Sequence, residues 1–256
     1  MRWVMFFALA LCLALVAPER SPAGGRGEKP LERLVYTAHY NWAFIWIEAG
    51  VIELTLTPSA KYPRAQRLFA VGRSTKDWIF RVRDTLISYH DSLTFLPYEF
   101  SRRAHEGSYH KIFDYKWDYA NKQIHARQER VNRYVRGDTL ALLPDTYDML
   151  SVAWKMREVD FSRYRQNDMI PIRILLDDKS YDLYVRYLGQ EHVKTRKGKR
   201  RCNVFSPLLV EGEVFKGGEG MKVWVSDDEA RLPMMMEAKI LVGSVKAILD
   251  ESKSSY

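Results

Sequence analysis

Apolar residues recur at every second position through most of the chain. In RLVYTAHY, Leu34, Tyr36, Ala38 and Tyr40 fall on one face, and FIWIEAGVIELTLTP follows as a second run of the same kind. Successive side chains of a β-strand point to opposite faces, so this spacing predicts strands with one buried face. Gly50 lies within the second run, and we expect a β-bulge there. The period of two argues against a mainly helical fold.

Alternating runs separated by short turn signals continue to the end of the chain. They predict about 11–12 strands within residues 33–250, each paired with its neighbour in an antiparallel meander. Twist accumulates in a sheet of this size and open edges are hazardous, so the sheet must curl or close. We therefore expect a single mainly β domain, a strongly curved half-barrel or barrel, followed by a disordered tail at residues 251–256.

One segment departs from this period. In PDTYDMLSVAWKMREVD, apolar residues recur at helical spacing and predict one amphipathic helix near residues 145–158. Pro144 and Asp145 can open a helix, with Asp145 as the N-cap or as an acid in the first turn. Such a helix must bury its apolar stripe, and the concave face of the curved sheet offers a place for it.

The N-terminus predicts the localisation of the protein. Val4 to Ala17 is an uninterrupted apolar stretch that follows a short positive start, and it is too short to span a bilayer as a mature helix. The pattern is typical of a secretory signal peptide within residues 1–23, cleaved after Ala17 or Ala23, with a flexible segment at residues 24–32. We expect export of the protein; a retained N-terminal anchor is the alternative.

The charge balance limits the partners of such a protein. The formal net charge is +8, which in an exported protein favours anionic lipid or acidic glycans over nucleic acid, or only a solvated basic surface. One dense basic cluster surrounds Gly198 at a predicted hairpin tip, where it could contact an anionic membrane surface or simply keep the sheet soluble. Its members are Lys194, Arg196, Lys197, Lys199, Arg200 and Arg201. Cys202 is the only cysteine beyond the signal peptide, so no intramolecular disulfide is expected.

The stretch VWVSDDEARLPMMMEAKILVGSVKAIL contains a pair of acids and three consecutive methionines. Asp227 and Asp228 lie between two predicted strands, where they favour a turn; a metal site would need further oxygen ligands, and no EF-hand spacing is present. From Met234 onward we expect one long strand, bent by a bulge at Gly243-Ser244. Methionine suits both a core and an adaptable apolar binding surface.

The sequence contains no recognised catalytic motif. None of the six histidines is spaced as in a zinc site, and there is no G-x-S-x-G elbow, P-loop or dinucleotide-binding fingerprint. Acid pairs for glycoside hydrolysis or a triad assembled in space remain open. We expect no metal and no cofactor.

Four motifs occur in the order found in a bacterial envelope family, the domain of unknown function 3108. They are E-A-G (Glu48–Gly50), D-x-L-S-x-x-W-x-x-R-x-x-D-F (Asp148–Phe161), W-V-S-D-D-x-x-R-L-P (Trp224–Pro233) and V-G-S-V-K-A-x-L (Val242–Leu249). The chain resembles this family over nearly its whole mature length. With the signal peptide, the resemblance implies a location in the periplasm or at the outer membrane of a Gram-negative bacterium. It implies no activity and no catalytic residues. It implies mostly structural roles, capping and pairing in the helix and turn formation in the loop, for Asp148, Ser151, Arg157, Asp227, Asp228, Arg231 and Pro233.

Three functions compete. The expected architecture is similar to that of periplasmic lipoprotein carriers, a likeness of fold alone. The first hypothesis is therefore a non-enzymatic module that binds a lipid or acyl chain between sheet and helix. The second is a structural or accessory component of an envelope assembly that contacts other envelope proteins, and the third is a hydrolase. For the first hypothesis, the candidate ligand-binding residues are Met149, Trp154, Met234 and Met236.

Overall fold

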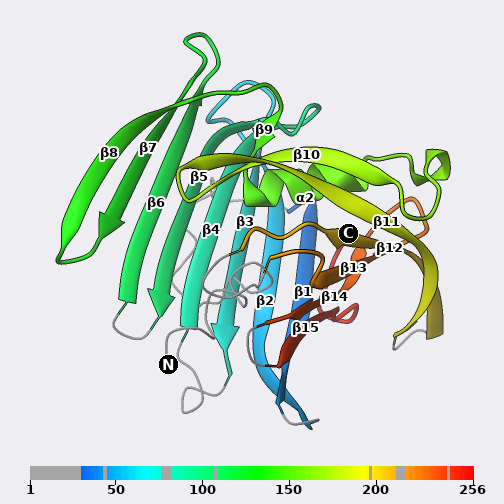
Figure 1. The fold of residues 1–256 in the computed structure, drawn as a ribbon. Coiled ribbons are helices and arrows are strands. Elements are labelled where there is room, and N and C mark those ends of the chain that lie inside the picture. The colour runs from blue at the N-terminus through cyan, green and yellow to red at the C-terminus, as the bar shows by residue number, and fades with distance from the viewer. Residues whose placement is uncertain are drawn as a thin grey trace.

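The computed structural model describes residues 30–42, 45–75, 82–106, 109–195, 198–211, 217–240 and 243–256 (Figure 1). The predicted signal peptide and most of the predicted flexible segment therefore lie outside the described residues. The last residue of that segment, Glu32, begins the first strand. Within the described part of the chain, no helix is long and apolar enough to cross a membrane.

The described residues form one sheet. Its strands are β1 (Glu32–Trp42), β2 (Ile45–Ser59), β3 (Ala65–Ser74), β4 (Val82–Asp91), β5 (Pro97–Glu106), β6 (Tyr109–Asp118), β7 (Gln123–Arg130), β8 (Tyr134–Ala141), β9 (Thr146–Tyr147), β10 (Met169–Leu176), β11 (Lys179–Thr195), β12 (Gly198–Pro207), β13 (Met221–Ser226), β14 (Pro233–Lys239) and β15 (Ser244–Leu249). The helix α2 (Met149–Arg157) and the short 3-10 helix η1 (Phe161–Arg163) lie between β9 and β10 in the chain.

Two meanders meet at the centre of this sheet. Strands β1 to β8 pair with their chain neighbours out to one edge, and β15 pairs with β1 so that β14 back to β9 follow on the other side. The pairs are antiparallel except β9 with β10, which are parallel. The edges, β8 and β9, are not joined, and Figure 1 shows the sheet curving without closing. The prediction of a mainly β, half-barrel-like meander with one helix is confirmed.

In the described part of the chain the sheet has 15 strands, more than the predicted 11–12. Strand β8 is exposed on both faces, so its sequence carries no alternation that could reveal it. The single long strand predicted from Met234 is a hairpin of β14 and β15, and the predicted bulge at Gly243-Ser244 is wrong. The Ile240 N–H donates to the Gly243 carbonyl, at 3.2 Å, to close the turn. Gly243 has φ +84°, and a Cβ there would lie 2.1 Å from the Asn41 carbonyl oxygen, so the turn requires glycine.

The bulge expected at Gly50 is present in the pairing of β1 with β2. Ala38 lies opposite Gly50, and the next residue, His39, lies opposite Glu48. Ala49 is therefore the extra residue on β2. A bulge increases local twist and bends the strand that carries it, which suits a long strand near the centre of a curved sheet.

Helix α2 begins later than its sequence suggests. Its N-cap is Asp148, whose Oδ1 accepts hydrogen bonds from the backbone N–H groups of Leu150 (2.7 Å) and Ser151 (2.9 Å). Asp145 has φ +53° and lies outside the helix, so its predicted capping role is wrong. The Asp148 Oδ2 also accepts from the Ser88 hydroxyl of β4 at 2.6 Å, a contact that local sequence could not reveal. Helix α2 contacts β3, β4 and β10 and thus lies between the two halves of the curved sheet, as expected (Figure 1).

The C-terminal residues 251–256 are ordered on the sheet, and the prediction of a disordered tail is wrong. The backbone groups of Ser255 and Arg33 exchange two hydrogen bonds of 2.7 and 2.8 Å, and the Ser254 hydroxyl accepts from the Val35 N–H at 2.9 Å. These contacts form because β1 extends past the end of β15 and leaves backbone groups that the last residues can pair.

A buried histidine lies at the end of β4. His90 is fully buried, its ring stacks on Phe95 at 5.7 Å between centroids, and neither ring nitrogen has a hydrogen-bond partner in the described structure. Burial disfavours the charged imidazolium and lowers the pKa of His90 from 6.5 to about 4.

This histidine should make the fold sensitive to mild acid. Because the pKa is lower in the folded state, the unfolded chain binds the extra proton first, so stability is complete above pH 6.5 and falls as the pH drops to 4. The loss attributable to His90 should reach about 3 kcal/mol. Urea unfolding at pH 7 and pH 4 measures it, with His90→Leu as the matched variant. An equal pH dependence in the two proteins would contradict this assignment.

Candidate functional site

A cavity of about 300 Å³ lies beside helix α2. The helix contributes Met149, Val152, Ala153 and Met156 to its wall. The facing wall comes from β10 to β14 and from η1. The lining residues outside the helix that carry apolar side chains are Phe161, Ile172, Ile174, Leu176, Tyr181, Leu183, Val185, Phe205, Pro207, Leu208, Leu209, Val210, Met221, Val223, Val225, Pro233 and Met236.

The alternation of the strands explains why this wall is apolar. Ile172, Ile174 and Leu176 share one face of β10, and Leu183 and Val185 share the corresponding face of β11. Most of these side chains are only partly buried, although they lie on the inner face of the sheet. The space between helix and sheet is therefore incompletely filled by the described side chains.

The polar lining of the cavity is small. Arg157, Asp177 and Glu211 are its charged members. Arg157 is committed to other contacts: its NH1 and NH2 groups donate to the two carboxylate oxygens of Glu32 at 2.7 and 2.8 Å. Its other hydrogen bonds go to the backbone carbonyls of Ala230 at 2.8 Å and Arg231 at 3.0 Å. This arginine thus lines the cavity without offering it a free charge.

The contacts of Arg157 also fix the helix in place. The NH1 group of Arg231 donates in turn to the carbonyl of Arg157 at 2.8 Å. Hydrogen bonds in both directions therefore connect the end of the helix to the β13–β14 loop. Glu32 belongs to β1, at the centre of the sheet. The C-terminal end of α2 is therefore tied to the sheet centre, while Asp148 ties its N-terminal end to β4.

The four predicted ligand-binding residues divide into two pairs. Met149 and Met236 line the cavity. Trp154 and Met234 are 6% and 2% exposed and belong to the main core, outside the cavity lining. Helical geometry separates Trp154 from Met149, because Trp154 lies on the helix face turned away from the cavity. On β14 the register with β13 shifts, so that Met234 is an extra residue between Pro233, opposite Val225, and Met235, opposite Trp224. The main cavity wall on β10 to β13 was missed by the sequence analysis.

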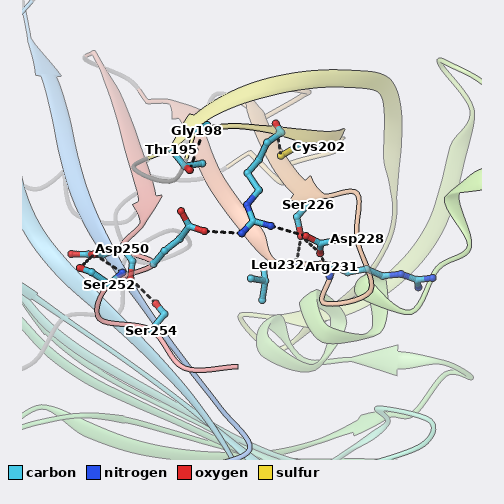
Figure 2. Close-up of polar contacts among 12 residues, drawn as sticks. Thr195, Gly198, Cys202, Ser226, Asp228, Arg231, Leu232, Asp250, Ser252 and Ser254 are labelled. Carbon is cyan, nitrogen blue, oxygen red and sulfur yellow. Dashed lines mark hydrogen bonds and ion pairs between the residues drawn. The ribbon is translucent and has the colours of Figure 1, made fainter.

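Asp227 and Asp228 lie in the loop between β13 and β14. Figure 2 shows Asp228 beside Ser226, Arg231 and Leu232. The Ser226 hydroxyl donates to Asp228 Oδ1 at 2.7 Å and accepts from the Leu232 N–H at 2.8 Å. The Arg231 N–H donates to Asp228 Oδ1 at 3.2 Å. The described residues contain no group of three or more metal-ligating side chains arranged to hold an ion.

The basic cluster is partly neutralised. Arg200 bridges Asp228 at 3.0 Å and Glu251 at 3.1 Å, linking this loop to the C-terminal segment drawn in Figure 2. Arg201 pairs with Asp227 at 2.7 Å. Lys194 and Lys199 are exposed at the β11–β12 hairpin tip, while Arg196 and Lys197 lie outside the described residues.

Comparison with known proteins identifies the family of the chain. The family model described as "Protein of unknown function (DUF3108)" matches residues 35–250. The chain belongs to the DUF3108 family. The crystal structure of a "Beta-barrel-like Protein of Domain of Unknown Function DUF1849" from Brucella abortus aligns with this DUF3108 chain at a TM-score of 0.54 and 10% identity, covering 85% of this chain and 94% of that one. That likeness concerns the fold alone. A search of curated proteins finds no match.

The residues of the DUF3108 chain that carried the resemblance now have observed contacts. Asp148 and Ser151 form a capping box in which each side chain accepts a hydrogen bond from the other residue's backbone N–H. Arg157 and Arg231 join the helix to the loop, and Asp227 and Asp228 anchor the loop to the basic hairpin. These contacts show that the residues hold the cavity's helix and its neighbouring loop in position.

Proposed function

We propose that this DUF3108 protein is an exported, non-enzymatic envelope protein that binds a hydrophobic ligand, such as a lipid or an acyl chain, beside α2. The observation that carries the proposal is the cavity of about 300 Å³, whose wall is apolar apart from three charged side chains. Ligand sites are typically concave and mainly apolar, with a few polar groups that set orientation. Burial of alkyl carbon in such a site contributes about 0.8 kcal/mol per methylene.

The partly buried side chains of β10, β11 and α2 support the same proposal. A fully packed core would leave these apolar residues close to zero exposure, because protein interiors are packed as densely as organic crystals. Here they lie on the inner face and still retain exposure toward the cavity. An apolar ligand would cover these side chains and make van der Waals contacts with them that are missing while the space is unfilled.

A bulky residue placed in the cavity should abolish binding. Ala153 lines the cavity from an exposed position on α2, so Ala153→Trp should fill the space without removing a core contact. We expect at least a tenfold weaker affinity for an uncharged apolar fluorophore such as N-phenyl-1-naphthylamine, measured by fluorescence titration. Glu158→Trp, at an exposed position outside the cavity lining, is the matched control and should bind as the unsubstituted protein does. Equal binding by both variants would place the ligand elsewhere.

A second candidate function rests on the sheet edge. Among the described residues, strand β8 pairs on one side only, with β7, and its residues Tyr134 and Val135 are 44% and 63% exposed. An exposed edge can add a strand from another protein, which favours a role as an accessory component of an envelope assembly. Substituting Val135→Lys should disrupt such an assembly without affecting fluorophore binding. Crosslinking in cells compares the partner proteins captured by the unsubstituted protein with those captured by this variant.

A further inference from the structure

The charges around the cavity constrain the head group that its ligand can carry. Asp177, at the tip between β10 and β11, and Glu211, after β12, are both exposed and both line the cavity. In the described part of the chain, neither carboxylate takes part in an ion pair or a side-chain hydrogen bond. They are therefore free to interact with a charge on a bound molecule.

The single cation in the lining has no such freedom. Arg157 is 13% exposed at its side chain and forms a two-point ion pair with Glu32, which is 10% exposed. Its other polar contacts go to the carbonyls of Ala230 and Arg231. An anionic head group would have to displace Glu32, leaving a carboxylate buried without its partner, and such a loss is costly.

We propose, on the basis of the proposed function, that the cavity selects a single-chain amphiphile with a cationic head group and rejects one with a carboxylate or phosphate. The alkyl chain would lie against the apolar wall, and the ammonium group would lie near Asp177 and Glu211. The volume of about 300 Å³ is at the lower limit of known small-molecule sites, which accommodates one chain and excludes the body of a two-chain lipid. Charge complementarity at the rim supplies the selectivity.

A ten-carbon series with one chain and three head groups tests the inference. Decylamine, 1-decanol and decanoate are each titrated against the fluorophore-loaded protein at pH 7 and low ionic strength. We expect decylamine to bind about three- to tenfold more tightly than decanol, the range expected for one or two solvent-exposed ion pairs, and decanoate to bind most weakly. The preference should decline as salt is added, because exposed charges are screened.

Removing the two rim charges should remove the preference. In Asp177→Asn combined with Glu211→Gln, decylamine and decanol should bind within a factor of two of each other. Asp182→Asn combined with Glu158→Gln removes the same charge from exposed positions outside the cavity lining and should preserve the preference. If fluorophore and decanol bind but decanoate competes as well as decylamine, this inference is overturned and the cavity function stands. If neither fluorophore nor any decyl compound binds, the proposed function fails as well.

Discussion

Replacing Arg157 with methionine should lower the free energy of unfolding by about 3–5 kcal/mol, the usual result of removing one partner from a buried ion pair. The substitution leaves the carboxylate of Glu32, 10% exposed, without the two hydrogen bonds of 2.7 and 2.8 Å that neutralise it. It also removes the donors to two carbonyls of the β13–β14 loop. Equilibrium unfolding in urea, followed by tryptophan fluorescence, measures the loss.

A second substitution separates the buried charge from the lost packing. Adding Glu32→Leu to Arg157→Met removes the orphaned carboxylate, so we expect the double variant to regain at least half of the lost stability. Equal free energies of unfolding for the single and the double variant would show that the unpaired Glu32 carboxylate contributes little to the lost stability. In that case the carbonyl contacts of Arg157 would account for its effect.

Replacing Trp154 with alanine should cost about 3–5 kcal/mol, as is typical when a large aromatic side chain is deleted from a packed core. Trp154 is 6% exposed and belongs to the main core, and the Arg157 guanidinium lies 5.2 Å from its ring. The same unfolding measurement applies. Because Trp154 does not line the cavity, its effect on fluorophore affinity should be small under conditions where the variant is folded.

Met149→Ala is the matched comparison on the same helix. Met149 lines the cavity and is only partly buried, so its deletion should cost less stability than that of Trp154 while altering ligand affinity. Trp154→Ala should therefore lose more stability, and Met149→Ala should change ligand affinity more. If Trp154→Ala were the less damaging substitution to the fold, the assignment of the two helix faces would be wrong.

The alternation of apolar residues is sufficient to predict the sheet and most of its strands. Leu34, Tyr36 and Ala38 lie on the buried face as their spacing indicates. Strand β8 could not be found in this way, because both of its faces are exposed and neither is selected for apolar residues. The turn at Gly243 was mistaken for a bulge, since a glycine that interrupts an apolar run fits either structure until the pairing partner is known.

The same alternation predicts only part of the candidate site. Alternation identifies which face of β10 points inward, but it does not show whether the space opposite that face is filled. Ile172 and Ile174 therefore look like ordinary core residues in the sequence, although they line the cavity. The N-cap was misplaced for a related reason. Asp145 and Asp148 are both suitable caps locally, and the hydroxyl of Ser88, distant in sequence, favours Asp148.

Native mass spectrometry of residues 1–256, expressed and purified without detergent, tests most directly whether the cavity binds an amphiphile. Spectra are compared before and after denaturing extraction with organic solvent, and the experiment is repeated on Ala153→Trp. We expect an additional mass of single-chain amphiphile size on the unsubstituted protein, lost on extraction and absent from Ala153→Trp. A protein that carries no additional mass, and that also fails to take up decylamine or decanol when they are added, would contradict it.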